Sequence, residues 1–287
     1  SRSLGRPVEG GVTSAGDVLL AGVGQRGLRA DGAVVALALD DGRVCWRTPL
    51  GGQVRGAPVV DEARVYATAC DGRLTCLDLR DGGDVWSRPV VEHAVTIAAS
   101  PVLVAEHGRT RAIVVATYGR RRDRQGGRVV AFNPRGQHVW APVEVDGNVA
   151  STPVVDGQTL YLTTYAQHPS RGALVALDAR TGKRRWTFAR RRAPGERGTC
   201  GLRAAPCVHR GTVYVASLDH HLYALDAKTG EVRWQHDLGK GSACQPTWLR
   251  GLIFVGTNDG NVHAVDAETG ARAWAYPLGG RIFTTPR

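Results

Sequence analysis

Arginine is the residue type in this chain best placed to do chemistry. The 287 residues carry 37 Lys and Arg against 26 Asp and Glu, a formal net charge of +11, and only Lys183, Lys228 and Lys240 are lysines. Arginine offers a planar fork of donors that matches carboxylates and phosphates. The excess predicts either recognition of an anionic partner or the Arg, Ala, Gly and Val bias of a GC-rich genome. The placement of the arginines must distinguish the two.

The cysteines give little support to metal or redox chemistry. No two are adjacent and no CxxC pair occurs, so a zinc or thioredoxin-type site is disfavoured. A repeat domain of this size needs no disulfides, and we interpret the cysteines as mostly reduced, buried, small apolar residues. They are Cys45, Cys70, Cys76, Cys200, Cys207 and Cys244.

Motifs of known enzyme chemistry are absent from the sequence. It contains no Ser-His-Asp arrangement, no Walker loop and no HExxH. The glycine pairs 51–52, 126–127 and 279–280 are interpreted as loop glycines and not as phosphate cradles. We therefore expect no catalytic residues, no cofactor and no metal ion in this chain.

A repeat dominates the sequence and predicts the elements that position the arginines. A strand-like run, a polar turn and a tryptophan recur at intervals of about 40–54 residues, a spacing typical of repeat architectures. We expect an all-β fold, a β-propeller of about six four-stranded antiparallel blades, with a seventh begun by the C-terminal strand as an alternative. The structural docking tryptophans are Trp46, Trp86, Trp140, Trp186, Trp234 and Trp274.

The blade at residues 204–234 shows the local logic. Its two central strands are apolar at nearly every position, as expected for a sheet buried on both faces. The Asp-Ala-x-Thr-Gly segment predicts a hairpin turn, in which Asp178, Asp226 and Asp266 bond backbone N–H groups and a glycine adopts positive φ. The tryptophan that follows is expected to pack on the neighbouring blade.

The pattern Ala-x-Asp-x-x-Thr-Gly-x-x-x-Trp, seen in 224–234 and 264–274, resembles the PQQ-like, tryptophan-docking repeat of quinoprotein-type propellers. It is similar to BamB-type assembly scaffolds and to the sensor propellers of bacterial Ser/Thr kinases. The resemblance covers nearly the whole chain and implies the fold, not an activity. Quinoprotein dehydrogenases of this kind carry two adjacent cysteines and a Glu/Asn/Asp calcium set, which the sequence lacks. A dehydrogenase is therefore the disfavoured alternative.

Insertions in the repeat predict one binding face. The lengthened segments 24–32, 118–128 and 165–172 connect second to third strands, and 189–201 joins two blades. All four would emerge at the same end of their blades, opposite the Asp-x-x-Thr-Gly hairpins. Long loops on a rigid scaffold commonly bind partners, although loops also collect charge for no functional reason. The arginines of this face are Arg26, Arg29, Arg120, Arg121, Arg122, Arg124, Arg128, Arg171, Arg190, Arg191, Arg192 and Arg197.

Histidines map to the same end, namely His168, His220 and His221. They come from separate blades, so a zinc site would need them to converge, and a turn role for His220 and His221 is the simpler interpretation. A protein or peptide partner, possibly acidic, or a small anionic ligand fits the arginines better than nucleic acid, since aromatic residues for stacking bases are sparse there.

We expect a single propeller domain over residues 1–287, with blades at 7–46, 57–86, 100–140, 151–186, 204–234 and 245–274 and a closing inner strand at 281–287. The lack of methionine indicates that Ser1 is a processed end or that the chain is one domain of a larger protein with other domains. No apolar run reaches the roughly 18 residues of a membrane span. The sequence favours a cytoplasmic, non-catalytic binding or sensor domain of a bacterial protein. A periplasmic or secreted location, a BamB-like envelope scaffold and a dehydrogenase remain alternatives.

Overall fold

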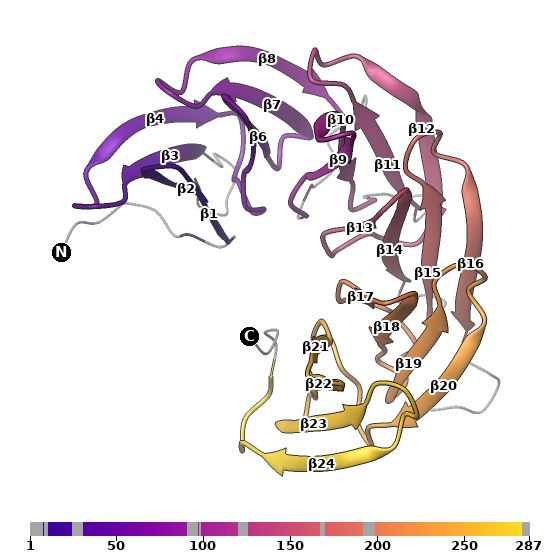
Figure 1. Cartoon of the computed structure of the whole chain (residues 1–287). Helices are drawn as coiled ribbons and strands as arrows, with labels where there is room; N and C mark the ends of the chain where they lie inside the picture. The colour runs from indigo at the N-terminus through magenta and orange to yellow at the C-terminus, as the bar shows by residue number, and fades with distance from the viewer. Residues whose placement is uncertain are drawn as a thin grey trace. The chain divides into compact units, whose positions relative to one another are not determined.

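The protein is built from β-strands in every part that the computed structural model describes, which comprises residues 8, 11–24, 31–90, 97, 99–119, 126–166, 170–191 and 199–282. No helix occurs in these residues. Figure 1 labels the strands along the chain. The chain divides into two compact units, Ser1–Glu144 and Val145–Arg287, and each is considered by itself below.

The first unit contains three sheets of four strands each. The strands are β1 (Val12–Ala15), β2 (Val18–Gly24), β3 (Gly32–Ala38) and β4 (Val44–Leu50); β5 (Val59–Asp61), β6 (Arg64–Thr68), β7 (Arg73–Asp78) and β8 (Asp84–Pro89); and β9 (Val102–Glu106), β10 (Arg109–Ala116), β11 (Gly126–Phe132) and β12 (His138–Asp146), the last of which ends at the start of the second unit.

The second unit repeats the arrangement three times. Its strands are β13 (Val154–Asp156), β14 (Thr159–Ala166), β15 (Arg171–Asp178) and β16 (Arg184–Arg191); β17 (Cys207–His209), β18 (Thr212–Ala216), β19 (His221–Asp226) and β20 (Val232–Asp237); and β21 (Thr247–Leu249), β22 (Leu252–Gly256), β23 (Asn261–Asp266) and β24 (Arg272–Pro277).

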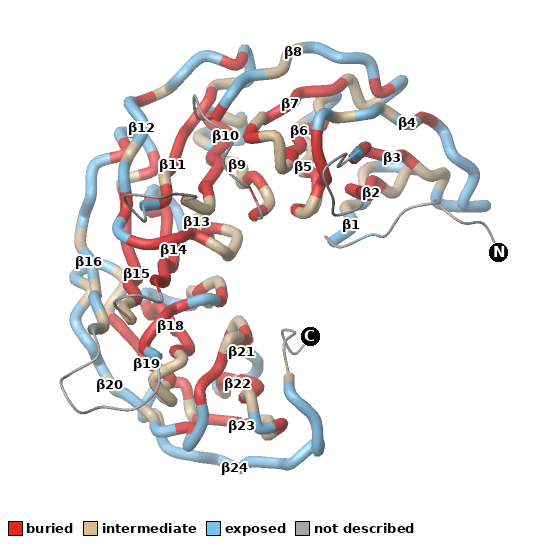
Figure 2. The backbone as a smooth tube through the Cα atoms, turned by 180° about the vertical axis from the view of Figure 1, so that it is seen from behind, coloured by how far each residue is buried: buried red, intermediate tan, exposed pale blue. Residues whose placement is uncertain are grey.

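Each sheet is an antiparallel meander in which strands pair in sequence order. The fold is therefore of the β-propeller type, with six four-stranded blades, as the repeat predicted. The second and third strands of a blade are buried, whereas the fourth is largely exposed (Figure 2). Strand β18 is buried at all five positions, while β20 is exposed or half-buried throughout, because a stacked blade covers its central strands on both faces.

The turn before the fourth strand has the geometry that its sequence predicts. Asp226 Oδ1 accepts the backbone N–H groups of Lys228 and Thr229, at 2.8 and 2.9 Å. Gly230 closes the turn at φ 78°, a left-handed conformation that glycine adopts without strain. Asp178 and Asp266 make equivalent bonds, so three blades share one turn.

The tryptophan after this turn docks on the turn of the next blade. Within the first unit the indole Nε1–H of Trp46 donates to Leu79 O at 2.9 Å, and that of Trp86 donates to Pro134 O at 3.0 Å. Trp186 and Trp234 do the same in the second unit. The ring lies on the turn glycine of the next blade, where a Cβ on Gly82 would come within 2.5 Å of the Trp46 ring.

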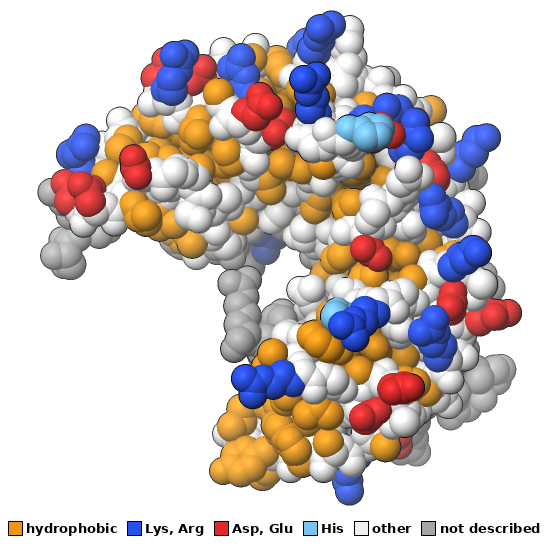
Figure 3. Space-filling model, in the orientation of Figure 1, with side chains coloured by type: hydrophobic (Ala, Val, Ile, Leu, Met, Phe, Trp, Pro, Cys, Tyr) orange, Lys and Arg blue, Asp and Glu red, His pale blue; other side chains and the backbone are white. Residues whose placement is uncertain are grey.

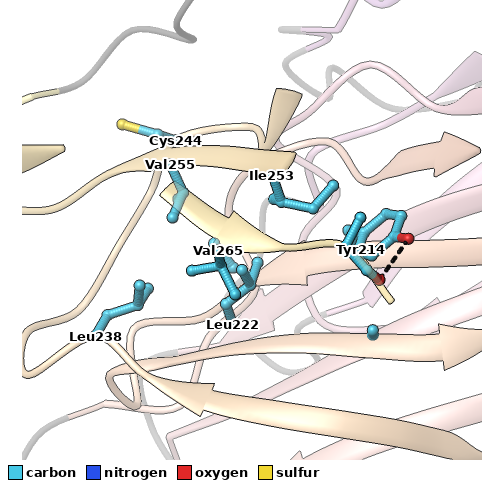
Figure 4. Close-up of a cluster of buried hydrophobic side chains, with 10 residues drawn as sticks. Tyr214, Leu222, Leu238, Cys244, Ile253, Val255 and Val265 are labelled. Atoms are coloured by element: carbon cyan, nitrogen blue, oxygen red, sulfur yellow. Dashed lines mark hydrogen bonds between the residues drawn. The ribbon is translucent and has the colours of Figure 1, made fainter. Parts of the chain in front are cut away.

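Two tyrosines reinforce the docking by sharing its acceptor. Tyr161 OH donates to Ala227 O, the carbonyl that also accepts the bond from Trp186. Tyr214 OH donates to Ala267 O at 3.0 Å beside Trp234, the bond dashed in Figure 4. Tyr66 holds the same strand position in the second blade, but its buried hydroxyl bonds to no carbonyl there.

The shorter turn of blade three accounts for the missing hydrogen bond of the Tyr66 hydroxyl. Its turn, Asn133-Pro134-Arg135-Gly136, is one residue shorter than the others, so Pro134 O accepts only the Trp86 indole. Burial raises the pKa of the Tyr66 phenol, and the Cys76 thiol beside it acts in the same direction.

The ends of the expected blades differ from the sheets in detail. Every fourth strand continues past its tryptophan, because strands three and four stay paired well beyond that residue; β15 and β16 pair as far as Arg171 with Arg191. Residues 283–287, most of the expected closing strand, lie outside the described residues. Ile282 itself packs against the core of blade six.

Candidate binding face

We define the loop face of a blade as the end that carries its second-to-third strand loop and its connection to the next blade. The opposite end, with the Asp-containing hairpins, is the turn face. In the described residues the turn face is committed to packing, since its carboxylates, glycines and carbonyls hold the turns and the docked tryptophans. The docking contacts described above thus lie at the turn face.

Few of the predicted binding arginines fall in the described residues. Arg128, Arg171 and Arg190 are described with their side chains, and only the backbone of Arg191 is described. The three side chains lie at strand ends, because β11 begins at Gly126 and β16 continues to Arg191; the segments 118–128 and 189–201 are thus only partly loops. The remaining predicted residues lie outside the described part: Arg26, Arg29, Arg120, Arg121, Arg122, Arg124, Arg192 and Arg197.

Each described arginine forms an ion pair at the loop face. Arg128 Nη2 lies 3.0 Å from Glu144 Oε1, and Arg171 Nη2 lies 2.6 Å from Asp146 Oδ1. The two carboxylates are 75% and 60% exposed, so these pairs are of the surface kind worth about 1 kcal/mol or less. A carboxylate from a partner could replace either acid at small cost, because a guanidinium has five N–H donors.

Arg190 is held more firmly. Its Nε donates to Asp219 Oδ2 at 2.8 Å, and Tyr223 OH donates to the same oxygen at 2.8 Å. The guanidinium also lies over the Tyr223 ring, 5.7 Å from its centroid. The side chain of Asp219 is only 11% exposed. Removing Arg190 would therefore leave a nearly buried negative charge without its ion-pair partner, which is destabilising.

The turn beside Asp219 departs from those of other blades. His220 adopts φ 77°, where Gly72 and Gly260 occupy the equivalent position at 84° and 89°. A non-glycine residue is uncommon in this region, so the surroundings hold His220 against a local preference. His221 Nδ1 lies 2.9 Å from Asp219 O, which places both histidines in a variant turn.

Arg203 was missed by the sequence reasoning. It lies in the connection between β16 and β17, exposed, with its guanidinium 4.7 Å from the centroid of the buried Tyr165 ring. It belongs to no arginine run, which is why composition did not single it out. The one signal was positional, since Arg55 holds the same place before the small-residue and proline start of blade two.

The described residues hold no group of three or more His, Cys, Asp or Glu side chains suited to a metal ion. His168 lies outside them. None of the six cysteines forms a disulfide; Cys76, Cys200 and Cys244 are buried, whereas Cys45 is exposed. Burial raises the pKa of the Cys76 thiol to about 11, which leaves it protonated and unreactive at neutral pH.

Together the antiparallel blades and the docked tryptophans define a β-propeller of the PQQ-like repeat class. The chain belongs to the family described as outer membrane protein assembly factor BamB, whose profile matches residues 1–168, 125–205 and 170–282. A solved BamB from Moraxella catarrhalis superposes with a TM-score of 0.70 at 21% identity, covering 96% of this chain and 78% of that one.

Curated relatives include outer membrane protein assembly factors, a serine/threonine-protein kinase and alcohol dehydrogenases, among them the 1-butanol dehydrogenase (cytochrome c) of Thauera butanivorans, which is 35% identical over 34% of this chain and 14% of its own length. The outer membrane protein assembly factor BamB of Yersinia pestis is 27% identical over 80% of this chain and 54% of its own length. The serine/threonine-protein kinase AfsK of Streptomyces coelicolor is 29% identical over 69% of this chain and 21% of its own length. The chain thus spans about half the length of this BamB relative and about a fifth of the kinase.

The cytoplasmic location expected from the sequence is wrong. Several relatives are named as outer membrane protein assembly factors, which points against a cytoplasmic location. No helix in the described residues is long and apolar enough to cross a bilayer.

Proposed function

We propose that the chain is a non-catalytic recognition propeller, a binding domain of a larger bacterial envelope protein. Its loop face would take an acidic segment of a protein or peptide. The observation that carries this proposal is the division of labour between the two ends of each blade. Docking occupies the turn face, while the loop face carries the insertions and arginines such as Arg128 and Arg171, which pair with exposed acids.

The family supports a scaffold role and leaves the sensor role as an inference. Several relatives are named as assembly factors of the outer membrane, and the kinase relative carries the repeat beside another activity. In either setting the propeller would supply a surface. The same arginine chemistry would recognise the partner, since bidentate pairs with carboxylates give both affinity and orientation.

The test uses poly-L-glutamate as a defined acidic probe. Replacing Arg120, Arg121 and Arg122 by Gln should weaken its binding at least about tenfold at low salt, the loss expected when several charge-assisted contacts disappear. Binding by the unaltered protein should also fall steeply with added salt, since screening acts over about 10 Å at 0.1 M. Isothermal titration calorimetry measures both effects.

A matched control exists on the turn face. Replacing the exposed Arg135, Arg180 and Arg272 by Gln removes the same charge from the opposite end of the blades. Binding should then stay within about twofold of the unaltered protein, apart from the long-range loss that salt removes. Equal losses in the two triple variants would refute the assignment to the loop face and leave only a general charge effect.

A quinoprotein-type dehydrogenase is the second candidate, because the fold is shared. The quinohemoprotein alcohol dehydrogenase of Comamonas testosteroni superposes with a TM-score of 0.62 at 14% identity, which shows the fold alone. No adjacent cysteine pair is present in the sequence to lie beneath a quinone. Incubation with the quinone and calcium, followed by a dye-linked alcohol assay, would favour this candidate if a bound chromophore and turnover appeared.

A further inference from the structure

The seam between blades five and six contains a contact that recurs in the propeller. The residue two places after a docking tryptophan donates to the carbonyl of the turn glycine in the next blade. Thr48 Oγ1 bonds Gly82 O at 2.6 Å, and Arg88 Nε bonds Gly136 O at 3.2 Å. In blade five this residue is His236, whose Nδ1 lies 3.0 Å from Gly270 O.

This contact determines the tautomer of His236. A carbonyl only accepts, so Nδ1 must carry the proton, and in the neutral ring Nε2 then holds a lone pair. His236 Nε2 is buried and has no hydrogen-bond partner in the described residues. The neutral ring therefore keeps a basic nitrogen inside the seam.

A second imidazole faces the first from the other side of the seam. His263, on β23, is 6% exposed, and its ring lies edge-on to that of His236 with centroids 6.4 Å apart. Neither Nδ1 nor Nε2 of His263 has a partner among the described residues. The pair thus presents three unpartnered ring nitrogens beside the apolar cluster shown in Figure 4, which includes Leu222, Ile253 and Val265.

His263 is specific to this seam. It pairs with the residue after the docking tryptophan, Ala275. The residues at that position in other blades do not titrate near neutral pH; they are Val35, Thr75, Val175 and Tyr223. Only blade six places an imidazole there among these five blades.

The charges around His263 disfavour its protonation. Burial lowers the pKa of His263 most, and His236 and then Arg272 act in the same direction, while Asp259 opposes them. The Asp259 carboxylate accepts hydrogen bonds from Thr257 Oγ1 at 2.5 Å and Asn261 Nδ2 at 3.0 Å, and it makes no hydrogen bond with either ring nitrogen of His263. An added proton would remain a buried, unpaired charge.

We propose that the His236–His263 pair makes the docking of blade six on blade five sensitive to pH, so that mild acid loosens blade six while blade five stays intact. The sign follows from linkage. A histidine with a lowered folded pKa supports the docked state above the unfolded value of about 6.5, and this support is lost as the pH falls below it. Each unit by which the docked value lies below the open one changes the opening equilibrium about tenfold.

Hydrogen exchange read by mass spectrometry tests the proposal on the whole chain. Protection of segment 247–277 should fall relative to segment 207–226 between about pH 7.5 and pH 5.5, the range in which histidine titrates, after correction for intrinsic exchange rates. His263→Val, which introduces the residue that Val35 and Val175 supply in their own blades, should abolish this pH response. Its persistence in that variant would overturn the proposal.

A second variant, His236→Thr, provides a control in case His263→Val disturbs the packing of blade six. His236→Thr keeps a donor for Gly270 O, as Thr48 does for Gly82 O, and removes the facing imidazole. It should reduce the response of segment 247–277 without lowering its protection at pH 7.5. His138→Gln on β12, an exposed histidine in another blade, should leave the response unchanged. An equal loss in His138→Gln would assign the effect to general charge and refute the pair.

Discussion

At the scale of the residue, the blades reuse one backbone carbonyl for two side chains. Ala227 O accepts the Trp186 indole and the Tyr161 hydroxyl, and Ala267 O accepts those of Trp234 and Tyr214. A carbonyl has two lone pairs, so both bonds can form without competition. Docking therefore depends on the exact length of the accepting turn, and the shorter turn of blade three loses the second bond.

Replacing Tyr214, Tyr161 and Tyr66 by Phe should change the free energy of unfolding by different amounts. Tyr214→Phe and Tyr161→Phe should each lower the free energy of unfolding by about 1 kcal/mol, because a buried hydrogen bond is lost. Tyr66→Phe should cost nothing or stabilise slightly, because its buried hydroxyl bonds no carbonyl. Urea denaturation measures all three. A loss for Tyr66→Phe equal to that for Tyr214→Phe would contradict the proposed role of the shared carbonyl.

At the scale of the element, the turn glycine serves two purposes that can be tested apart. Gly82 has φ 72° and lies against the Trp46 ring, which is 8% exposed. Gly42 has nearly the same φ of 67°, but a Cβ there would meet nothing within 4 Å. The two positions share the backbone conformation and differ in whether a tryptophan docks on them.

Replacing each glycine by alanine isolates the docking contribution. Gly42→Ala should cost about 1 kcal/mol of stability, the expense of a left-handed conformation for an L-residue. Gly82→Ala should cost at least about 2 kcal/mol more, since its Cβ would displace the Trp46 ring. Thermal unfolding with tryptophan fluorescence measures both. Equal losses would show that φ alone explains the glycines.

Much of the turn geometry and strand order could be predicted from the sequence, because the repeat supplies six copies of one pattern. The turn aspartates, the positive φ of Gly182, Gly230 and Gly270 and the strand order follow from local residue chemistry. The extent of the fourth strands and the Arg203–Tyr165 contact do not, since both depend on pairing and packing between distant segments. The seam of His236 and His263 was missed because neither residue belongs to the repeated motif.

At the scale of the whole molecule, the repeated turn gives the protein a shared sensitivity to acid. The side chain of Arg233, then the backbone N–H groups of Thr229 and Lys228, lower the pKa of Asp226 to about 2. At Asp178 burial alone would raise the pKa, but the bonds from Arg185 and Thr181 outweigh it and the pKa is lowered. The pKa of Asp266 is lowered too, chiefly by Thr269.

These shifts set an acid-unfolding window. A carboxylate with a lowered folded pKa stabilises the fold above its unfolded value of about 3.9 and loses that effect as the pH falls toward the folded value. Stability should therefore fall between about pH 4 and pH 2, below the range in which His263 acts. The stability difference between the unaltered protein and Asp226→Asn, measured by urea titration, should shrink across this window. A constant difference would contradict the ionic role of Asp226.

The tryptophan of blade six differs from the docked Trp46 in its exposure. Trp274 is 45% exposed, and apolar side chains gather over β24 in Figure 3, where Tyr276 and Leu278 are 62% and 63% exposed. Trp46, which is docked, is 8% exposed. The contrast indicates that burial of these tryptophans comes from the following blade and not from their own sheet.

The placement of each tryptophan and each turn glycine in the same blade has a consequence for how such a chain can change length during evolution. Each repeat carries a tryptophan and a turn glycine in its sequence, and blades two and five use both, the tryptophan on the blade that follows and the glycine under the tryptophan of the blade that precedes. A duplication or deletion that begins and ends at equivalent positions therefore leaves new neighbours with a matching tryptophan and turn glycine. Whole repeats can be gained or lost in single genetic events, whereas a deletion between non-equivalent positions would leave a tryptophan without the turn glycine on which it docks.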